Sequence, residues 1–213
     1  MHEEKNWLLE NRAHRCVDNL NKHRFNARYV ASEDELKREI AKLLEEAETV
    51  GFGGSATVRG LGIQGMAASM GKEVLDHGQE GLTFEESLAA RRGQQVCDLF
   101  FTSANGLSET GEIVNVDGIG NRTNAMCFGP KRVVVVAGHN KITPDLHSAL
   151  DRVRKVAGPM RAKSLGVDTP CAVTGVCSDC NAPMRICNIT TILHRKPMLS
   201  EVVVFVVGEE LGY

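Results

Sequence analysis

The stretch Val133-Val-Val-Val-Ala137, which runs directly into Gly138-His-Asn-Lys-Ile142, decides the fold of this chain. An unbroken β-branched run without polar alternation predicts a strand that is buried on both faces, as in parallel sheets covered by helices. A second such run, Val202–Val207, follows near the C-terminus. Both runs are far too short to span a bilayer, so no membrane span is predicted.

Helical segments alternate with these strands. Ser32 and Glu35 have the spacing of a capping box, in which hydroxyl and carboxylate satisfy each other's backbone amides. Apolar residues then recur at helical spacing over Leu36–Ala47. Thr143-Pro144 predicts a later helix start, because a threonine cap precedes a first-turn proline. The other predicted elements are a charged helix over about Glu3–Arg24, strands at Asn26–Val30, Thr49–Phe52 and Val96–Thr102, and helices over Phe84–Arg92 and Asn121–Phe128.

This alternation predicts an α/β fold, with a single Rossmann-like domain over residues 1–213 and a mostly parallel sheet flanked by helices. Residues 1–30 are predicted to form an N-terminal helical extension, and residues 168–190 a cysteine-rich metal segment near the C-terminus. The chain is 42% hydrophobic and 24% charged, which is typical of a domain with a well-filled core.

The charge balance and the cysteine count limit the expected partners and compartment. A formal net charge of −2 gives no reason to expect binding to nucleic acid or to an anionic membrane surface. The N-terminal residues are charged and polar, so no secretory signal is predicted. Seven cysteines, an odd number, fit a reducing cytoplasm better than a disulfide framework.

Four cysteines lie within seventeen positions near the C-terminus: Cys171, Cys177, Cys180 and Cys187. Four thiols are the usual full ligand set of a structural zinc or of an iron–sulfur cluster. The spacing C-x5-C-x2-C-x6-C matches neither the ferredoxin pattern nor a zinc ribbon. A metal site is therefore predicted here, with scattered reduced thiols as the alternative. The other three cysteines are expected to be bystanders: Cys16, Cys97 and Cys127.

A glycine-rich loop follows the predicted strand Thr49–Phe52. Its residues Gly53, Gly54, Ser55 and Thr57 form a candidate ligand-binding loop, because glycines admit a ligand to the backbone and a following helix N-terminus favours an anion. The alternative is a tight strand-to-helix turn capped by one of the two hydroxyls. The loop lacks the Lys-Ser/Thr ending of a nucleotide P-loop.

A polar loop over Thr102–Arg122 begins at the C-terminal end of another predicted strand, where open α/β sheets place their ligands. Glu109 is the first candidate for a general base and Glu112 the second, because carboxylates held near a strand end can accept a proton. Arg122 is a candidate clamp for a substrate carboxylate. Asn105 and Asn121 complete the polar set. The alternative is a solvated hairpin rich in turn residues.

Lys141 follows the Val133 strand, again at a predicted C-terminal strand end. It is a candidate partner for an anionic ligand, and the alternative is an ordinary surface lysine. Because these loops follow neighbouring strands, the glycine loop, Asn105, Glu109 and Lys141 are expected to share one pocket that prefers a carboxylate or a phosphate.

These motifs, taken in order, resemble the lactate-utilization (LUD) domain family. The residues that carry the resemblance are Gly53–Thr57, Thr102–Asn105, Glu109–Asn115, Asp117–Arg122, Phe128–Lys131, Asn140–Ile142, Arg152–Arg154 and Gly208–Tyr213, together with the cysteine run. The resemblance implies the fold of ribose-phosphate isomerases, glucosamine-phosphate deaminases and CoA transferases. In those relatives a Gly-Ser-Thr loop holds phosphate or cofactor, and acidic loops at the next strand ends do the chemistry.

The resemblance also implies a part in oxidising L-lactate, or a similar small hydroxy acid, to pyruvate within a system rich in iron–sulfur proteins. An iron–sulfur cluster on the four cysteines, with [4Fe–4S] favoured over zinc, would then serve electron transfer or substrate handling. Expected partners are a small anionic substrate and other iron–sulfur proteins of lactate oxidation, and a homo-oligomer is left open. The rival functions are a binding or regulatory protein with a structural zinc and a phosphorylated or CoA-like ligand, or an isomerase or hydrolase with Glu109 or Glu112 as base.

Overall fold

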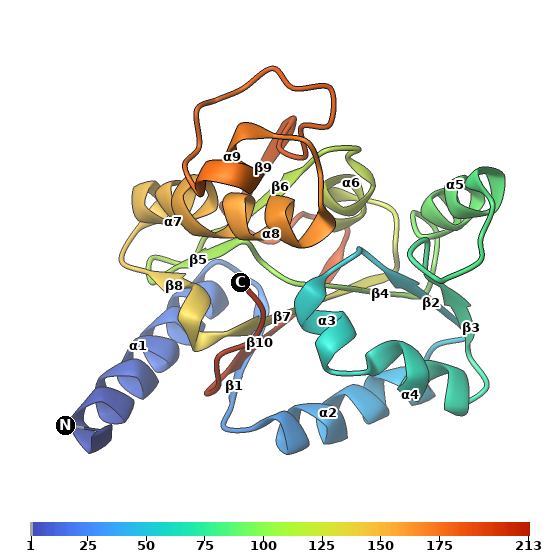
Figure 1. Ribbon diagram of the computed structural model, residues 1–213. Coiled ribbons are helices and arrows are strands. Elements are labelled where there is room, and N and C mark those ends of the chain that lie inside the picture. Colours follow the sequence, from blue (N-terminus) through green and yellow to red (C-terminus); the bar gives the residue numbers. More distant parts are fainter. Residues whose placement is uncertain (1) are drawn as a thin grey trace.

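The computed structural model describes residues 2–213 and contains two sheets packed face to face (Figure 1). The larger sheet has six strands in the order β1-β10-β7-β4-β2-β3, and every neighbouring pair is parallel. Its strands are β1 (Asn26–Val30), β2 (Thr49–Phe52), β3 (Glu73–Leu75), β4 (Leu99–Thr102), β7 (Arg132–Gly138) and β10 (Glu201–Val207).

The smaller sheet has four short strands in the order β8-β5-β6-β9. The pairs β5–β6 and β6–β9 are antiparallel, and β5 pairs with β8 in parallel. Its strands are β5 (Gly106–Ser108), β6 (Ile113–Asp117), β8 (Ile142–Thr143) and β9 (Ile189–Leu193). This sheet connects the ends of β4 and β7 to the cysteine segment, because β5 follows β4, β8 follows β7, and β9 follows the cysteines.

Alternate residues of the central strands supply two separate cores. Val134 and Val136 face one side of the large sheet, where they meet α2 (Glu33–Glu45), α3 (Ala56–Gly60) and α4 (Ile63–Ser69). Within α2, the buried residues Leu36, Ile40 and Leu44 lie one turn apart, so the helix presents a single apolar stripe to the sheet.

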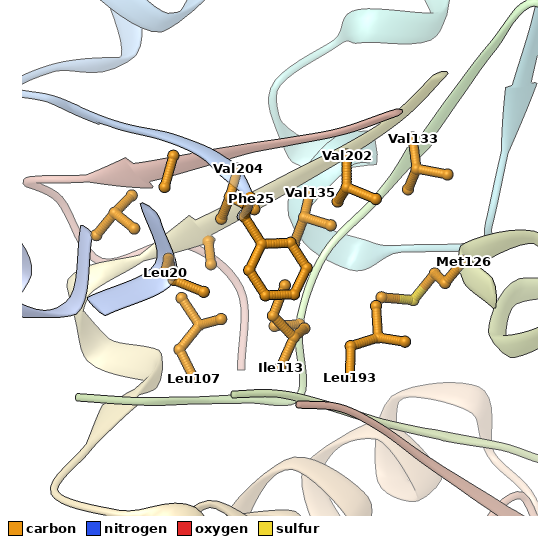
Figure 2. Packing of buried hydrophobic residues seen from close by; sticks show 14 of the residues in the cluster. Leu20, Phe25, Leu107, Ile113, Met126, Val133, Val135, Leu193, Val202 and Val204 are labelled. Atoms are coloured by element: carbon orange, nitrogen blue, oxygen red, sulfur yellow. The ribbon is translucent and has the colours of Figure 1, made fainter. Parts of the chain in front are cut away.

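Val133 and Val135 face the opposite side, where the smaller sheet, α1 (His2–Lys22) and α6 (Asn121–Cys127) cover them (Figure 2). Phe25 lies in the middle of this core, between the valines of the large sheet and residues of the small one. α1 and β1 therefore complete the sheet and its core, since α1 packs against the sheet and β1 pairs with β10.

A third layer covers the outer face of the small sheet. The chain runs there through α7 (Leu146–Arg152), a π-helical stretch η2 (Val153–Ala157) and α8 (Gly158–Leu165), and Ala149 and Val153 pack on Val114. The remaining elements are α5 (Phe84–Gly93), the short 3-10 helix η1 (His139–Lys141) and α9 (Pro170–Thr174). Within residues 2–213, no helix combines the length and the apolar character needed to cross a bilayer.

The structure confirms the α/β class and the mostly parallel sheet, while the Rossmann-like detail stays a prediction. β1 and β2 have the predicted bounds, Ser32 caps α2 as expected, and Thr83 caps α5. Two element starts were wrong. The predicted strand at position 96 begins only at Leu99, because residues 90–96 turn through backbone hydrogen bonds. The helix predicted from Thr143-Pro144 begins at Leu146 with Asp145 as its cap, because Thr143 pairs in β8.

Asp98 ties together the amino ends of three adjacent strands. Its Oδ2 accepts hydrogen bonds from the backbone N–H groups of Glu48 (3.1 Å) and Thr49 (2.9 Å) and from the Thr49 hydroxyl (3.0 Å). Its Oδ1 lies 2.6 Å from Lys131 Nζ, just before β7. Lys131 and these N–H donors hold the pKa of Asp98 well below its ordinary value of 3.8.

We expect Asp98→Asn to lower the free energy of unfolding by about 2 kcal/mol at pH 7, because charge-assisted hydrogen bonds are lost. A carboxyl group whose pKa is lowered by folding stabilises the folded protein at pH values above its pKa in the unfolded chain. That stabilisation is lost as the pH falls through its pKa in the folded protein. The difference from wild type should therefore shrink below about pH 4. Urea unfolding from pH 7 to pH 3 measures it, with the exposed Asp18→Asn variant of α1 as control.

Candidate functional site

A cavity of about 320 Å³ lies at the carboxyl ends of the central strands, between them and the η2–α8 layer. Loops after β2, β4 and β7 form its floor, and the cysteine segment forms part of its wall. All eight residues predicted to bind a ligand line this one cavity: Gly53, Gly54, Ser55, Thr57, Asn105, Asn121, Arg122 and Lys141. The carboxyl edge of a parallel sheet is where α/β proteins place their ligands.

The glycines of the first loop are required by close neighbours. A Cβ atom at Gly53 would lie 3.0 Å from the Phe100 ring and 3.1 Å from Arg122. Gly54 has a φ of +69°, and a Cβ atom there would lie 3.1 Å from His77 Nε2. A side chain at either position would therefore collide with Phe100, Arg122 or His77, and this close packing, with the positive φ of Gly54, accounts for both glycines.

The hydroxyls of the same loop have structural partners. Ser55 Oγ accepts a hydrogen bond from the Val58 N–H and so caps α3. Thr57 Oγ1 donates to the Leu211 carbonyl at 3.3 Å and thereby holds the C-terminal segment against the loop. Because α3 has only five residues, its dipole adds little, and the attraction of the cavity for an anion rests on cationic side chains instead.

Lys141 is the most buried of these cations, with 4% of its surface exposed. It closes η1 after β7, and its Nζ lies 2.8 Å from both Thr57 Oγ1 and Ser103 Oγ. Burial, with Arg152 and Arg122 nearby, lowers the pKa of Lys141 to about 7. Within residues 2–213, no carboxylate forms an ion pair with it.

Arg122 reaches the cavity from the second position of α6. Its guanidinium pairs with Asp117 at 3.1 Å and donates to Asn105 Oδ1 at 3.4 Å, while its Nε is buried without a partner among the described residues. The Asn105 carbonyl accepts a hydrogen bond from Arg152 Nη1 at 2.6 Å. Asn121 donates to Gln94 Oε1 at 3.2 Å. This wall of the cavity thus carries an unused, buried donor beside Lys141.

Six further lining residues were not predicted to bind a ligand, although Arg154 and Tyr213 lie in motifs that carry the family resemblance. They are His77, Arg91, Arg154, Arg161, Arg185 and Tyr213. Arg161 donates to the Gly54 carbonyl, and burial lowers its pKa. Five of the lining residues are arginines, and Asp117 carries the one carboxylate side chain among them. A cavity with this charge balance attracts small anions.

His77 follows β3, a three-residue strand that carries no sequence pattern. Its Nδ1 lies 3.0 Å from Gln94 Nε2, and its Nε2 faces Gly54. Burial, and then the nearby Arg91 guanidinium, lowers the pKa of His77. The lowered pKa favours the neutral ring, whose Nε2 faces the glycine loop.

All four clustered cysteines line the same cavity: Cys171, Cys177, Cys180 and Cys187. Burial raises the pKa of the Cys187 thiol, and the thiols of Cys177 and Cys180 are close enough to raise it further. All seven cysteines of the chain are free thiols. Within residues 2–213, no three His, Cys, Asp or Glu side chains converge closely enough to hold one metal ion.

Arg185 organises the cysteine segment. Its guanidinium donates to the carbonyls of Cys180 and Cys187 and to Asp179 Oδ1 at 2.8 Å. Asp179 has a φ of +48°, a left-handed backbone that turns the chain between two of the cysteines. The segment is also fixed to the end of β6, because the Asn188 N–H donates to the Asp117 carbonyl at 2.9 Å.

Glu109 and Glu112 do not line the cavity, which corrects the expectation that Glu109 shares it. Glu109 forms ion pairs with Arg12 at 2.7 Å and Arg15 at 3.0 Å, and so joins the β5–β6 turn to α1. Burial tends to raise the pKa of Glu112, but hydrogen bonds from Ser108 and Thr110 outweigh it and the pKa is lowered. Their catalytic roles stay predictions, and both carboxylates have structural partners.

Fold and site together define a parallel α/β protein with a cationic, cysteine-lined cavity at its strand ends. The sequence model of the LUD domain matches residues 13–207, which is most of the chain. The chain therefore belongs to the LUD domain family, as its motifs had indicated.

A solved structure with a similar fold is that of a DUF162 family protein from Deinococcus radiodurans. The two superpose with a TM-score of 0.55 at 16% sequence identity, over 93% of this chain and 98% of the other. At that identity the likeness concerns the fold alone. No curated protein matches the chain in sequence.

We expect Glu109→Gln to lower the free energy of unfolding by about 1 kcal/mol, because two partly buried ion pairs are lost. Ligand binding in the cavity should be unchanged. Denaturant unfolding and titration with a small carboxylate anion, each beside the exposed Glu10→Gln variant of α1, test this. A folded variant with normal stability but a binding or turnover defect would return Glu109 to the functional site.

Proposed function

We propose that this LUD domain protein acts in the oxidation of L-lactate, or of a similar small 2-hydroxy acid, to the 2-oxo acid. In this proposal Cys171, Cys177, Cys180 and Cys187 hold an iron–sulfur cluster, with [4Fe–4S] favoured. Membership of the LUD domain family supports a role related to lactate utilization. The finer assignment rests on the cavity and on the thiols of this chain.

The observation that carries the proposal is that the four thiols and the cationic residues line one cavity. A cluster held there would lie beside a bound anion rather than at a remote structural position. The cavity has a volume of about 320 Å³, which suits a small organic acid. Arg122, whose buried Nε has no partner among the described residues, and Arg161 line this cavity and can donate N–H groups to a carboxylate.

A [4Fe–4S] cluster is favoured over zinc because the cysteine spacing is irregular and the family resemblance points to redox metabolism. In a [4Fe–4S] cluster each cysteine binds a different iron, so all four thiols must meet around one body. All four cysteines line one cavity, as a shared cluster requires.

A bound cluster would supply one-electron transfer. Oxidation of a 2-hydroxy acid to a 2-oxo acid releases two electrons and two protons, so a single cluster on this chain cannot retain both electrons. The proposal therefore includes other iron–sulfur proteins as electron acceptors. The chain's own residues bind and orient the acid: the arginines hold its carboxylate, and the glycine loop lines the cavity beside them.

We expect anaerobically purified protein to be brown and to contain iron and acid-labile sulfide in equal amounts. The Cys177→Ser, Cys180→Ser double variant should lose this content, because two of four ligands are missing. Cys127→Ser, whose thiol lies outside the cavity, should keep it. Metal and sulfide analysis with electron paramagnetic resonance measures the outcome. Colourless protein containing zinc, or a double variant that keeps its metal, would refute the cluster.

We expect Arg122→Gln to weaken binding of L-lactate and pyruvate by about tenfold or more, because a charged hydrogen bond to a carboxylate contributes roughly 1.5–3 kcal/mol. Arg161→Gln, on α8, should do the same without disturbing the Asp117 ion pair. Isothermal titration measures both, with the exposed Arg38→Gln variant as control. Unchanged affinity in both cavity variants would contradict this site for the acid.

A further inference from the structure

Lys141 has an environment that simple anion binding does not explain. Its side chain is 4% exposed and lies on the cavity wall, at the end of the strand that forms the centre of the sheet. A lysine held there as a permanent cation would need a carboxylate partner to offset its desolvation. The ion pairs within residues 2–213 include none to Lys141.

The hydrogen bonds of Lys141 match a neutral amine. Nζ lies 2.8 Å from Thr57 Oγ1 and 2.8 Å from Ser103 Oγ. Both hydroxyls have backbone carbonyls for their own protons, Leu211 at 3.3 Å and Ala104 at 3.5 Å. Both oxygens therefore accept from Nζ, which uses the two N–H groups of a neutral amine and leaves its lone pair free. An ammonium would instead bring a third, unpaired N–H into a buried site.

The charges around the amine favour the same form. Arg122 from α6 and Arg152 from α7 are the charged groups that act on it, and both are cationic. Thr57 and Ser103, its partners from α3 and the end of β4, are uncharged. Burial and the two guanidiniums together lower the pKa of Lys141 to about 7, from an ordinary 10.5. Desolvation next to another cation is a recognised way to turn a lysine into a nucleophile.

We propose that Lys141 is a nucleophile that forms a Schiff base with the carbonyl carbon of a small 2-oxo acid. The choice of a 2-oxo acid rests on the proposed function, because a 2-oxo acid is the product of the proposed oxidation. The reactivity of the amine rests only on the cavity.

The reaction balances without an oxidant or reductant. The Nζ lone pair adds to the carbonyl carbon, and the carbonyl oxygen takes a proton from the nitrogen, which gives a carbinolamine. Loss of the hydroxyl group and the second amine proton as one water leaves the C=N bond. The adjacent carboxylate needs a cationic partner, and Arg122, whose buried Nε has no partner among the described residues, lies on the same cavity and close enough to act on Lys141.

Reductive trapping tests the proposal on the intact chain. The protein is incubated with pyruvate and sodium cyanoborohydride, digested, and mapped by mass spectrometry. At pH 7 about half of a lysine with a pKa of about 7 is neutral, against roughly 0.04% of an ordinary lysine. We expect Lys141 to be labelled at least about a hundredfold more than the exposed Lys163. Labelling of Lys141 should reach half its maximum near pH 7.

Lys141→Met should abolish the adduct and Lys163→Met should retain it. Acetone, a ketone without a carboxylate, should label Lys141 much less than pyruvate. If the wild-type digest shows no adduct at Lys141, or one no stronger than at Lys163, the proposal is overturned, and this reading does not depend on the variant folding. Iron and sulfide are measured on the same preparation, so a missing adduct in cluster-loaded protein refutes only the nucleophile, and an adduct in metal-free protein refutes only the cluster.

Discussion

The dry environment of the two central strands is the constraint on which the rest of the structure depends. Between its end residues, β7 carries only valine and alanine, and β10 only valine and phenylalanine, so neither face of either strand can meet water. Both faces must be covered, by helices α2 to α4 on one side and by α1, α6 and the small sheet on the other. Parallel strands under two layers leave their carboxyl ends as the place where polar loops can gather.

The sequence patterns predicted five of the six strands of the large sheet, but neither β3 nor the strands of the small sheet. The valine runs gave β7 and β10 almost residue for residue, because continuous burial leaves an unmistakable pattern. β5 and β8 have three and two residues, too few for any periodicity to appear. Thr143 illustrates the difficulty. Its position before a proline is typical of a helix cap, but Thr143 instead pairs in the small sheet, for which the local sequence has no pattern.

The candidate site was predictable where it depends on strand ends and not where it depends on packing. Gly54, Asn105 and Lys141 come together because their strands are neighbours. Glu109 was expected beside them, yet the β5–β6 turn directs it to two arginines of α1. Arg161 was missed for the converse reason, because an arginine on a helix looks solvated until the position of that helix over the glycine loop is known.

The order β1-β10-β7 has a consequence for how the chain reaches this state. β1 comes within the first thirty residues, but its neighbour β10 begins at Glu201, and β10 also separates β1 from β7. While the chain emerges from the ribosome, β1 and β7 each keep an open edge until the last strand arrives between them. Pairing of such distant segments is slow, and open strand edges invite aggregation. The nascent chain thus has a long interval in which chaperone protection matters. This interval ends only when β10 inserts between β1 and β7.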